Sequence, residues 1–138
     1  MEHFGAQLPA DSLAVLQAQT TRVIACLEIV PVALALEAWA ERTRHRRVFV
    51  FVDNDAARAS LIKMSTNVDS MKIALLRVAA LKRATPSFLW FARVPSSSNP
   101  GDAPSRLEDL EVDRPGAKKI EVSLSWLERR RTPLSRTV

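Results

Sequence analysis

The sequence has little cysteine, no long uninterrupted apolar run and no N-terminal targeting pattern. Its single cysteine, Cys26, excludes an internal disulfide and a cysteine-rich metal site, and its apolar neighbours predict a place in the core of a protein from a reducing compartment. The longest apolar run, residues 29–40, is interrupted by Pro31 and Glu37 and is shorter than the ~20 residues of a membrane helix. Because no basic stretch leads into an apolar core at the start, we expect no secretory signal. These features predict an intracellular protein, in the cytoplasm or the nucleus, without a membrane partner.

The composition is that of one folded domain. The chain has 138 residues, of which 47% are hydrophobic and 25% charged, so it is neither collagen-like nor disordered as a whole. Its formal net charge of +5 favours a polyanionic partner, usually nucleic acid. The basic residues are unevenly spread, and one cluster consists of Arg42, Arg44, Arg46 and Arg47.

The pattern of apolar residues predicts an α/β domain. Helical spacing over residues 23–42 indicates a helix that contains Pro31 and bends there. Residues 48–52 are a continuous β-branched and aromatic run, which is typical of a strand buried on both faces at the centre of a parallel sheet. Helices over residues 56–63 and 71–83 follow, and residues 88–94 form a second strand. Strand, helices and strand make a crossover unit, so the two strands should be parallel.

In the remaining segments fewer residues indicate a particular secondary structure. Residues 3–8 could form a short edge strand, residues 95–104 read as a loop, and residues 106–112 as a short acidic helix. Residues 113–138 form a basic tail in which residues 120–124 alternate like a strand, so the domain itself is expected over residues 1–112. We expect Trp39 and Trp90 to pack between helix and sheet, and both histidines, His3 and His45, to lie on the surface.

Three carboxylates are candidates for a common site. Asp53 follows the first strand of the crossover unit, and ligand sites of parallel sheets gather outside the carboxyl ends of the strands. Asp102 lies in the loop after the second strand, and Glu28 lies on the preceding helix. Carboxylates that meet in this way could share Mg²⁺ ions, which take oxygen ligands. The alternative is that Asp53 or Asn54 only caps the following helix.

At these residues the sequence resembles ribonuclease H, and it is most similar to the ribonuclease H domains that follow reverse transcriptases in retroelements. The resemblance is carried by the segments 28–39, 48–54, 67–70, 90–95 and 99–106. The most specific of them is the last, which reads Asn-Pro-Gly-Asp-Ala-Pro-Ser-Arg. The resemblance spans residues 21 to about 107.

The resemblance implies a ribonuclease H-like mixed sheet with parallel central strands flanked by helices. It implies an endonuclease that hydrolyses the RNA strand of RNA–DNA hybrids with two Mg²⁺ ions, for which Mn²⁺ can substitute. Glu28, Asp53 and Asp102 would be both the catalytic residues and the metal ligands. The residues expected to contact the nucleic acid are Asn54, Asn67, Arg44, Arg46 and Arg47.

The chain departs from the family at its beginning. The family's first catalytic aspartate stands on an N-terminal strand, and no apolar strand ending in aspartate precedes Glu28. We therefore expect the first strands to be missing, with an upstream reverse transcriptase segment as the source of the absent aspartate. Three carboxylates offset the repulsion between two close cations less well than four, which predicts weakened metal binding and activity.

Two other interpretations are open at this point. The chain could be a non-catalytic, degenerate remnant of a retroelement polyprotein that binds nucleic acid through its arginines or has a structural role. It could also be an unrelated small α/β domain in which Asp53 serves as a helix cap or a phosphoacceptor. Convergence of Glu28 and Asp102 on Asp53 separates the ribonuclease H interpretation from the last one.

Overall fold

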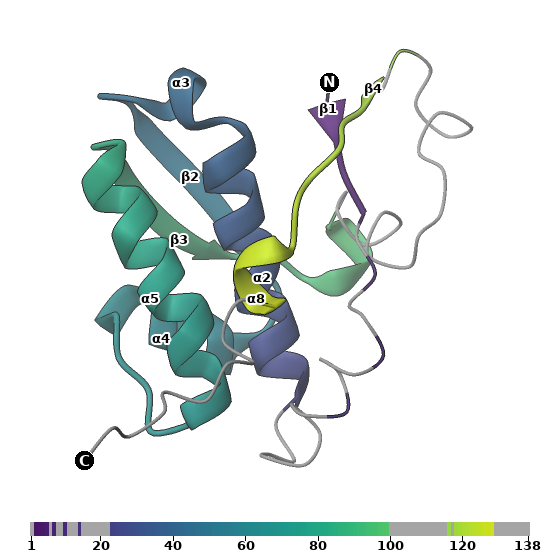
Figure 1. Ribbon diagram of the computed structural model, residues 1–138, viewed down its shortest axis with the longest axis vertical. Helices are drawn as coiled ribbons and strands as arrows, with labels where there is room; N and C mark the ends of the chain where they lie inside the picture. Colours follow the sequence, from purple (N-terminus) through teal and green to yellow (C-terminus); the bar gives the residue numbers. More distant parts are fainter. Residues whose placement is uncertain are drawn as a thin grey trace, which may run out of the picture.

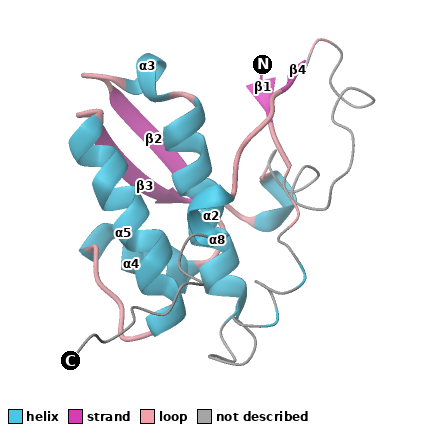
Figure 2. Ribbon diagram, in the orientation of Figure 1, coloured by secondary structure: helices cyan, strands magenta, loops and turns pink. Residues whose placement is uncertain are grey.

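The computed structural model describes residues 2–5, 7, 10, 14, 23–99, 116 and 118–128. These residues form an α/β structure in which helices accompany two small pairs of parallel strands (Figures 1 and 2). The predicted α/β class is therefore confirmed. Asp102, the predicted helix over 106–112 and most of the predicted tail lie outside the described residues.

Helix α2, Val23–Ala38, is the centre of the described structure. It runs through Pro31 as one helix, so the apolar spacing on both sides of the proline was the correct signal. Pro31 is exposed, whereas apolar side chains around much of the helix are buried. The helix packs along α5 on one side and lies beside the β1–β4 pair on the other (Figure 1). The short helix α3, Ala40–Thr43, follows after Trp39.

The predicted crossover unit is present. Strand β2, Arg47–Val52, pairs in parallel with β3, Phe88–Arg93, in a register that places Phe49 opposite Trp90. The connection consists of α4, Asp55–Lys63, and α5, Asp69–Ala84. In the described part of the chain this sheet has two strands, so the larger mixed sheet remains a prediction.

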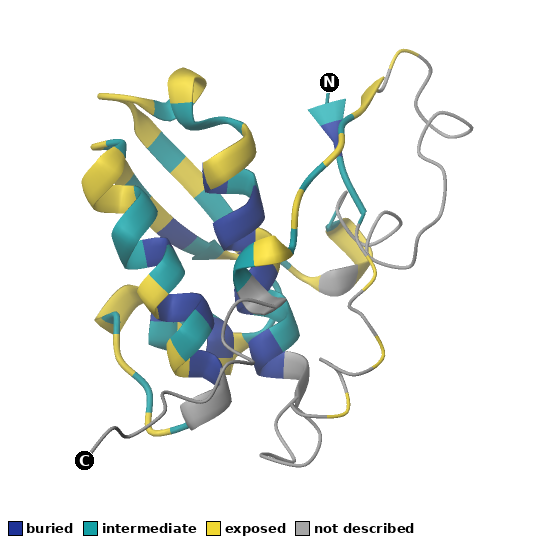
Figure 3. Ribbon diagram, in the orientation of Figure 1, coloured by how far each residue is buried: buried dark blue, intermediate teal, exposed yellow. Residues whose placement is uncertain are grey.

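The prediction that β2 is buried on both faces is wrong. Val50, Val52, Leu89 and Phe91 face the core, where α2, α4 and α5 contribute most of the buried residues (Figure 3). Alternate residues point to the other face, where Phe49 is 67% and Trp90 is 58% exposed. The expectation that Trp90 packs between helix and sheet is therefore also wrong, because the pleat directs successive side chains to opposite faces.

The two ends of the described chain meet. Strand β1, Glu2–His3, pairs in parallel with β4, Lys118–Lys119, and the amide of Ile120 donates to the carbonyl of His3 at 2.8 Å. Residues 120–124 are not a strand and lead instead into α8, Ser125–Glu128. His3 is buried, so its predicted surface position is wrong, whereas His45 is exposed as expected.

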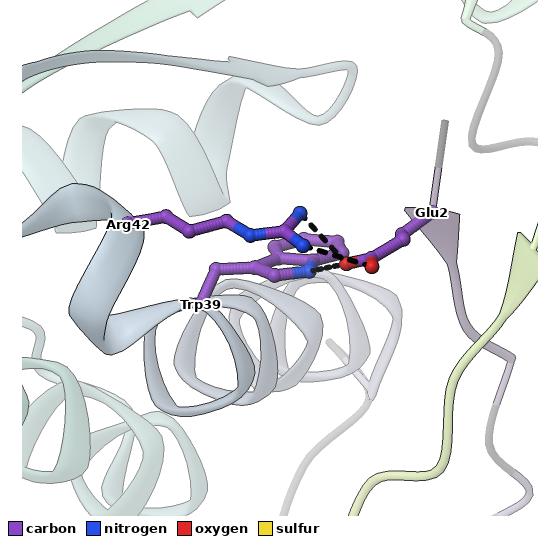
Figure 4. Close-up of polar contacts among 3 residues, drawn as sticks. All are labelled: Glu2, Trp39 and Arg42. Atoms are coloured by element: carbon purple, nitrogen blue, oxygen red, sulfur yellow. Dashed lines mark hydrogen bonds and ion pairs between the residues drawn. The ribbon is translucent and has the colours of Figure 1, made fainter.

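Glu2 links β1 to the segment that follows α2, which contains Trp39 and helix α3. Its carboxylate accepts a hydrogen bond from the indole Nε1 of Trp39 at 2.8 Å and a two-pronged ion pair from Arg42 at 2.8 and 2.9 Å (Figure 4). Phe4 packs against the ring of Trp39, with 5.7 Å between ring centroids. Arg42 is thereby assigned to an intramolecular contact and not to the free basic surface.

This contact should depend on pH. The hydrogen bond from Trp39, followed by that from Arg42, lowers the pKa of Glu2 below 4.5. Because the folded pKa is depressed, the stabilisation is complete above 4.5 and is lost as the pH falls through the folded pKa. The NMR signal of the Trp39 indole N–H should therefore shift on acidification below pH 4.5. In Glu2→Gln this shift should be absent, and an identical titration in both proteins would contradict the assignment.

Candidate functional site

The carboxyl edge of the β2–β3 sheet brings together the two chain segments predicted to carry the site. Asp53 follows β2 directly and is half-buried. The amide of Val94, the first residue after β3, donates to the carbonyl of Val52 at 3.2 Å. The chain that leaves β3 therefore starts beside Asp53 and continues into the 3₁₀-helix η1, Ser96–Ser98.

The residues after Asp53 begin helix α4. The side chain of Asn54 accepts a hydrogen bond from the amide of Ala57 at 2.9 Å and so caps the helix. Of the two residues considered as a cap, Asn54 is therefore the one that caps α4, and Asp53 is not. Asp55 is exposed and pairs with Arg93 at 3.5 Å across the same edge.

Glu28 lies in the second turn of α2, where it is half-buried between the buried residues Cys26 and Ile29. Helix α2 contacts α4, the helix that begins two residues after Asp53. Glu28 thus lies on a helix that packs against α4, and Asp53 lies in the link between β2 and α4. Burial raises the pKa of the Cys26 thiol, which keeps it protonated as expected of a core residue.

The structure describes two of the three predicted metal ligands. These two, Glu28 and Asp53, are both carboxylates of the kind that Mg²⁺ prefers. Over residues 2–5, 23–99 and 118–128 no group of three histidine, cysteine, aspartate or glutamate side chains could hold a metal ion. Since Asp102 lies outside those ranges, the convergence of all three carboxylates remains a prediction.

The predicted nucleic-acid contacts are spread over the molecule. Arg44, Arg46 and Arg47 are exposed at the amino end of β2, the end opposite Asp53. Asp53 follows Arg47 by six positions, which corresponds to about 20 Å along an extended strand. Asn67 is exposed in the turn between α4 and α5. The arginines and Asp53 therefore do not form one compact site, but an extended polyanion could reach both.

The amino edge of the sheet collects positive charge from two elements. The amide of Phe88 donates to the carbonyl of Arg46 at 2.9 Å, which brings the end of α5 close to the start of β2. Lys82 and Arg83 in the last turn of α5 are exposed there. Arg44 lies 3.8 Å from Glu41, whereas no described acidic side chain pairs with Arg46, Arg47, Lys82 or Arg83.

The exposed aromatic residues on one face of the β2–β3 sheet were not predicted from the sequence. Four large apolar side chains are exposed on it, namely Phe49, Phe51, Phe88 and Trp90. A signal was present in β2, where phenylalanine and valine alternate over Val48–Val52. In the structure the valines of β2 face the core and the phenylalanines are exposed. The sequence did not reveal this difference, because both residue types also occur in strands that are buried on both faces.

Comparisons of the chain with models of protein families, with curated proteins and with solved structures found no match. Among the described helices, none is long and apolar enough to span a bilayer. The assignment of a function therefore depends on the residues and geometry given above.

Proposed function

We propose that this chain is a ribonuclease H-like domain that binds RNA–DNA hybrids and hydrolyses their RNA strand. The observation that carries the proposal is the position of Asp53 at the carboxyl edge of a parallel crossover unit, beside the chain that leaves β3. Ligand sites of parallel α/β sheets lie at this edge. Asp102 is located eight residues after Val94, and Glu28 is on the helix that packs against α4.

In this proposal Glu28, Asp53 and Asp102 hold magnesium through their carboxylate oxygens. When bound, such ions lower the pKa of a water and neutralise charge on the leaving oxygen. Asp53 would hold the ions, Glu28 would help to position the attacking water, and Asp102 would serve the leaving side. With three carboxylates, activity should require more Mg²⁺ than a site of four would.

The test is cleavage of a labelled RNA–DNA hybrid at increasing Mg²⁺. We expect Asp53→Asn to reduce cleavage to the background without enzyme. The matched control is Asp55→Asn, because Asp55 lies two residues away, is exposed and pairs with Arg93. Equal cleavage by the wild type and Asp53→Asn, or no cleavage with Mg²⁺ or Mn²⁺, would contradict the proposal.

A second candidate is a non-catalytic module that binds nucleic acid. It is favoured by the exposed cations of the amino edge, which lie about 20 Å from Asp53. Binding through these cations should weaken steeply with salt, because phosphate contacts release counterions. Salt-sensitive binding of the hybrid without metal-dependent cleavage would support this function over the nuclease.

A further inference from the structure

The face of the β2–β3 sheet that points away from the helices carries four exposed aromatic side chains. They are Phe49 and Phe51 on β2 and Phe88 and Trp90 on β3. The register places Phe49 directly opposite Trp90, and strands of a sheet are about 4.8 Å apart. Phe49 and Phe51 follow each other on one strand at about 6.6 Å. The four rings therefore form one continuous surface, which we call the aromatic face.

Positive charge borders the aromatic face. Arg47 lies on the same face of β2, opposite Phe88 in the register, and is exposed. Arg46, Lys82 and Arg83 lie at the adjoining amino edge without an ion pair to any described residue. Neither strand contains an acidic residue. The surface thus combines aromatic rings with unneutralised cations.

We propose that the aromatic face binds single-stranded RNA by stacking bases on its rings while the arginines contact phosphates. Rings on a sheet flanked by cations fit a single strand, whose bases are free to stack, and not a duplex, whose bases are already stacked. A second copy is the alternative occupant. Pairing with the strands in the same direction would bring the cations together, whereas pairing with opposite directions would place them against the carboxylates of the other edge, so the oligomeric state is measured with the binding test. The choice of RNA over DNA rests on the proposed function, whose substrate contains an RNA strand.

The stacking part of the proposal is tested with a fluorescent oligouridine and the full chain. Trp90→Ala and Phe49→Ala should each raise the Kd about tenfold in fluorescence anisotropy. Both side chains are more than half exposed, so the fold should persist. The matched control is Leu76→Ala on α5, because Leu76 is 55% exposed but lies outside the sheet. An unchanged Kd in Trp90→Ala would overturn the proposal.

The charge part is tested by the salt dependence of the same binding. Arg47→Gln should reduce the slope of log K against log salt by about 0.7, the contribution of one phosphate contact on a single strand. Lys63→Gln, which removes an exposed charge at the end of α4, should leave the slope unchanged. An equal slope in Arg47→Gln and the wild type would contradict the role of the arginine.

Three further outcomes would overturn the proposal in different ways. Tighter binding of oligothymidine than of oligouridine would exclude RNA as the occupant. A wild-type dimer that Trp90→Ala converts to a monomer would assign the aromatic face to self-association. Absence of oligouridine binding at low salt would remove the site altogether. Hybrid cleavage measured on the same preparations reports separately on Asp53, so failure of the nuclease proposal is distinguishable from failure of this one.

Discussion

Replacing Ile29 by alanine should lower the free energy of unfolding by about 2–5 kcal/mol. Ile29 is fully buried on α2, in the core cluster that also contains Leu61 of α4 and Val78 of α5. The loss has two parts, the transfer free energy of the removed methyl and methylene groups and the cavity that remains. Since small domains are stable by only about 5–15 kcal/mol, urea unfolding should show a clearly lower midpoint.

The matched control is Ile62→Ala. The chemical change is the same, but Ile62 is 55% exposed on α4, so little buried surface is lost and no closed cavity forms. Its effect on the free energy of unfolding should remain within about 0.5 kcal/mol. Equal losses in the two variants would contradict the arrangement of α2 at the centre of the core.

The crossover unit could be predicted because its signals are local. The run Val48–Val52 and the segment from Phe88 are rich in residues that favour strands, and helical periodicity fills the interval. The helical connection between the two strands then predicts that they are parallel. The same local logic placed a helix cap at Asp53 or Asn54, and the hydrogen bond that Asn54 accepts from the amide of Ala57 assigns the cap to Asn54.

Burial could not be predicted as well, because it depends on distant parts of the chain. The alternation of phenylalanine and valine in β2 distinguishes the two faces of the strand, but it does not tell whether a further layer covers the phenylalanine face. The pairing of β1 with β4 joins residues more than a hundred positions apart, and His3, one of the paired residues, is buried. Lys118 and Lys119 carry no apolar pattern that would mark them as a strand.

The candidate site could also be predicted from the sequence only in part. The position of Asp53 at the end of a strand follows from sequence, whereas the distribution of positive charge does not. Arg42 is close in sequence to Arg46 and Arg47, yet it forms an ion pair with Glu2 near the N-terminus. Arg46 and Arg47 remain at the amino edge, one strand length from Asp53. The sheet thus separates a cationic edge from an edge with carboxylates, and any partner of both must be elongated.

Replacing Pro31 by alanine should raise the free energy of unfolding by about 2 kcal/mol. Pro31 lies in the interior of α2, where it cannot donate a hydrogen bond to the carbonyl of Leu27, four residues earlier. Proline costs about 3 kcal/mol relative to alanine in such a position, but it also restricts the unfolded chain, which returns about 0.4–1 kcal/mol. Because Pro31 is exposed, its removal leaves no cavity. Urea unfolding should show the higher midpoint.

The control for the proline is Pro86→Ala, with an expected effect of opposite sign. Pro86 is exposed between α5 and β3, and its carbonyl accepts the amide of His45 at 2.6 Å, a contact that alanine retains. The folded state therefore changes little, while the unfolded chain gains freedom, so the free energy of unfolding should fall by about 0.4–1 kcal/mol. If Pro31→Ala also destabilised the protein, the proline would be required for the path of α2 between α5 and the β1–β4 pair. If Pro31→Ala raises the free energy of unfolding while Pro86→Ala lowers it, the proline is not required for the path of α2. The burial of α2 residues on both sides of Pro31 then maintains the helix despite the missing hydrogen bond.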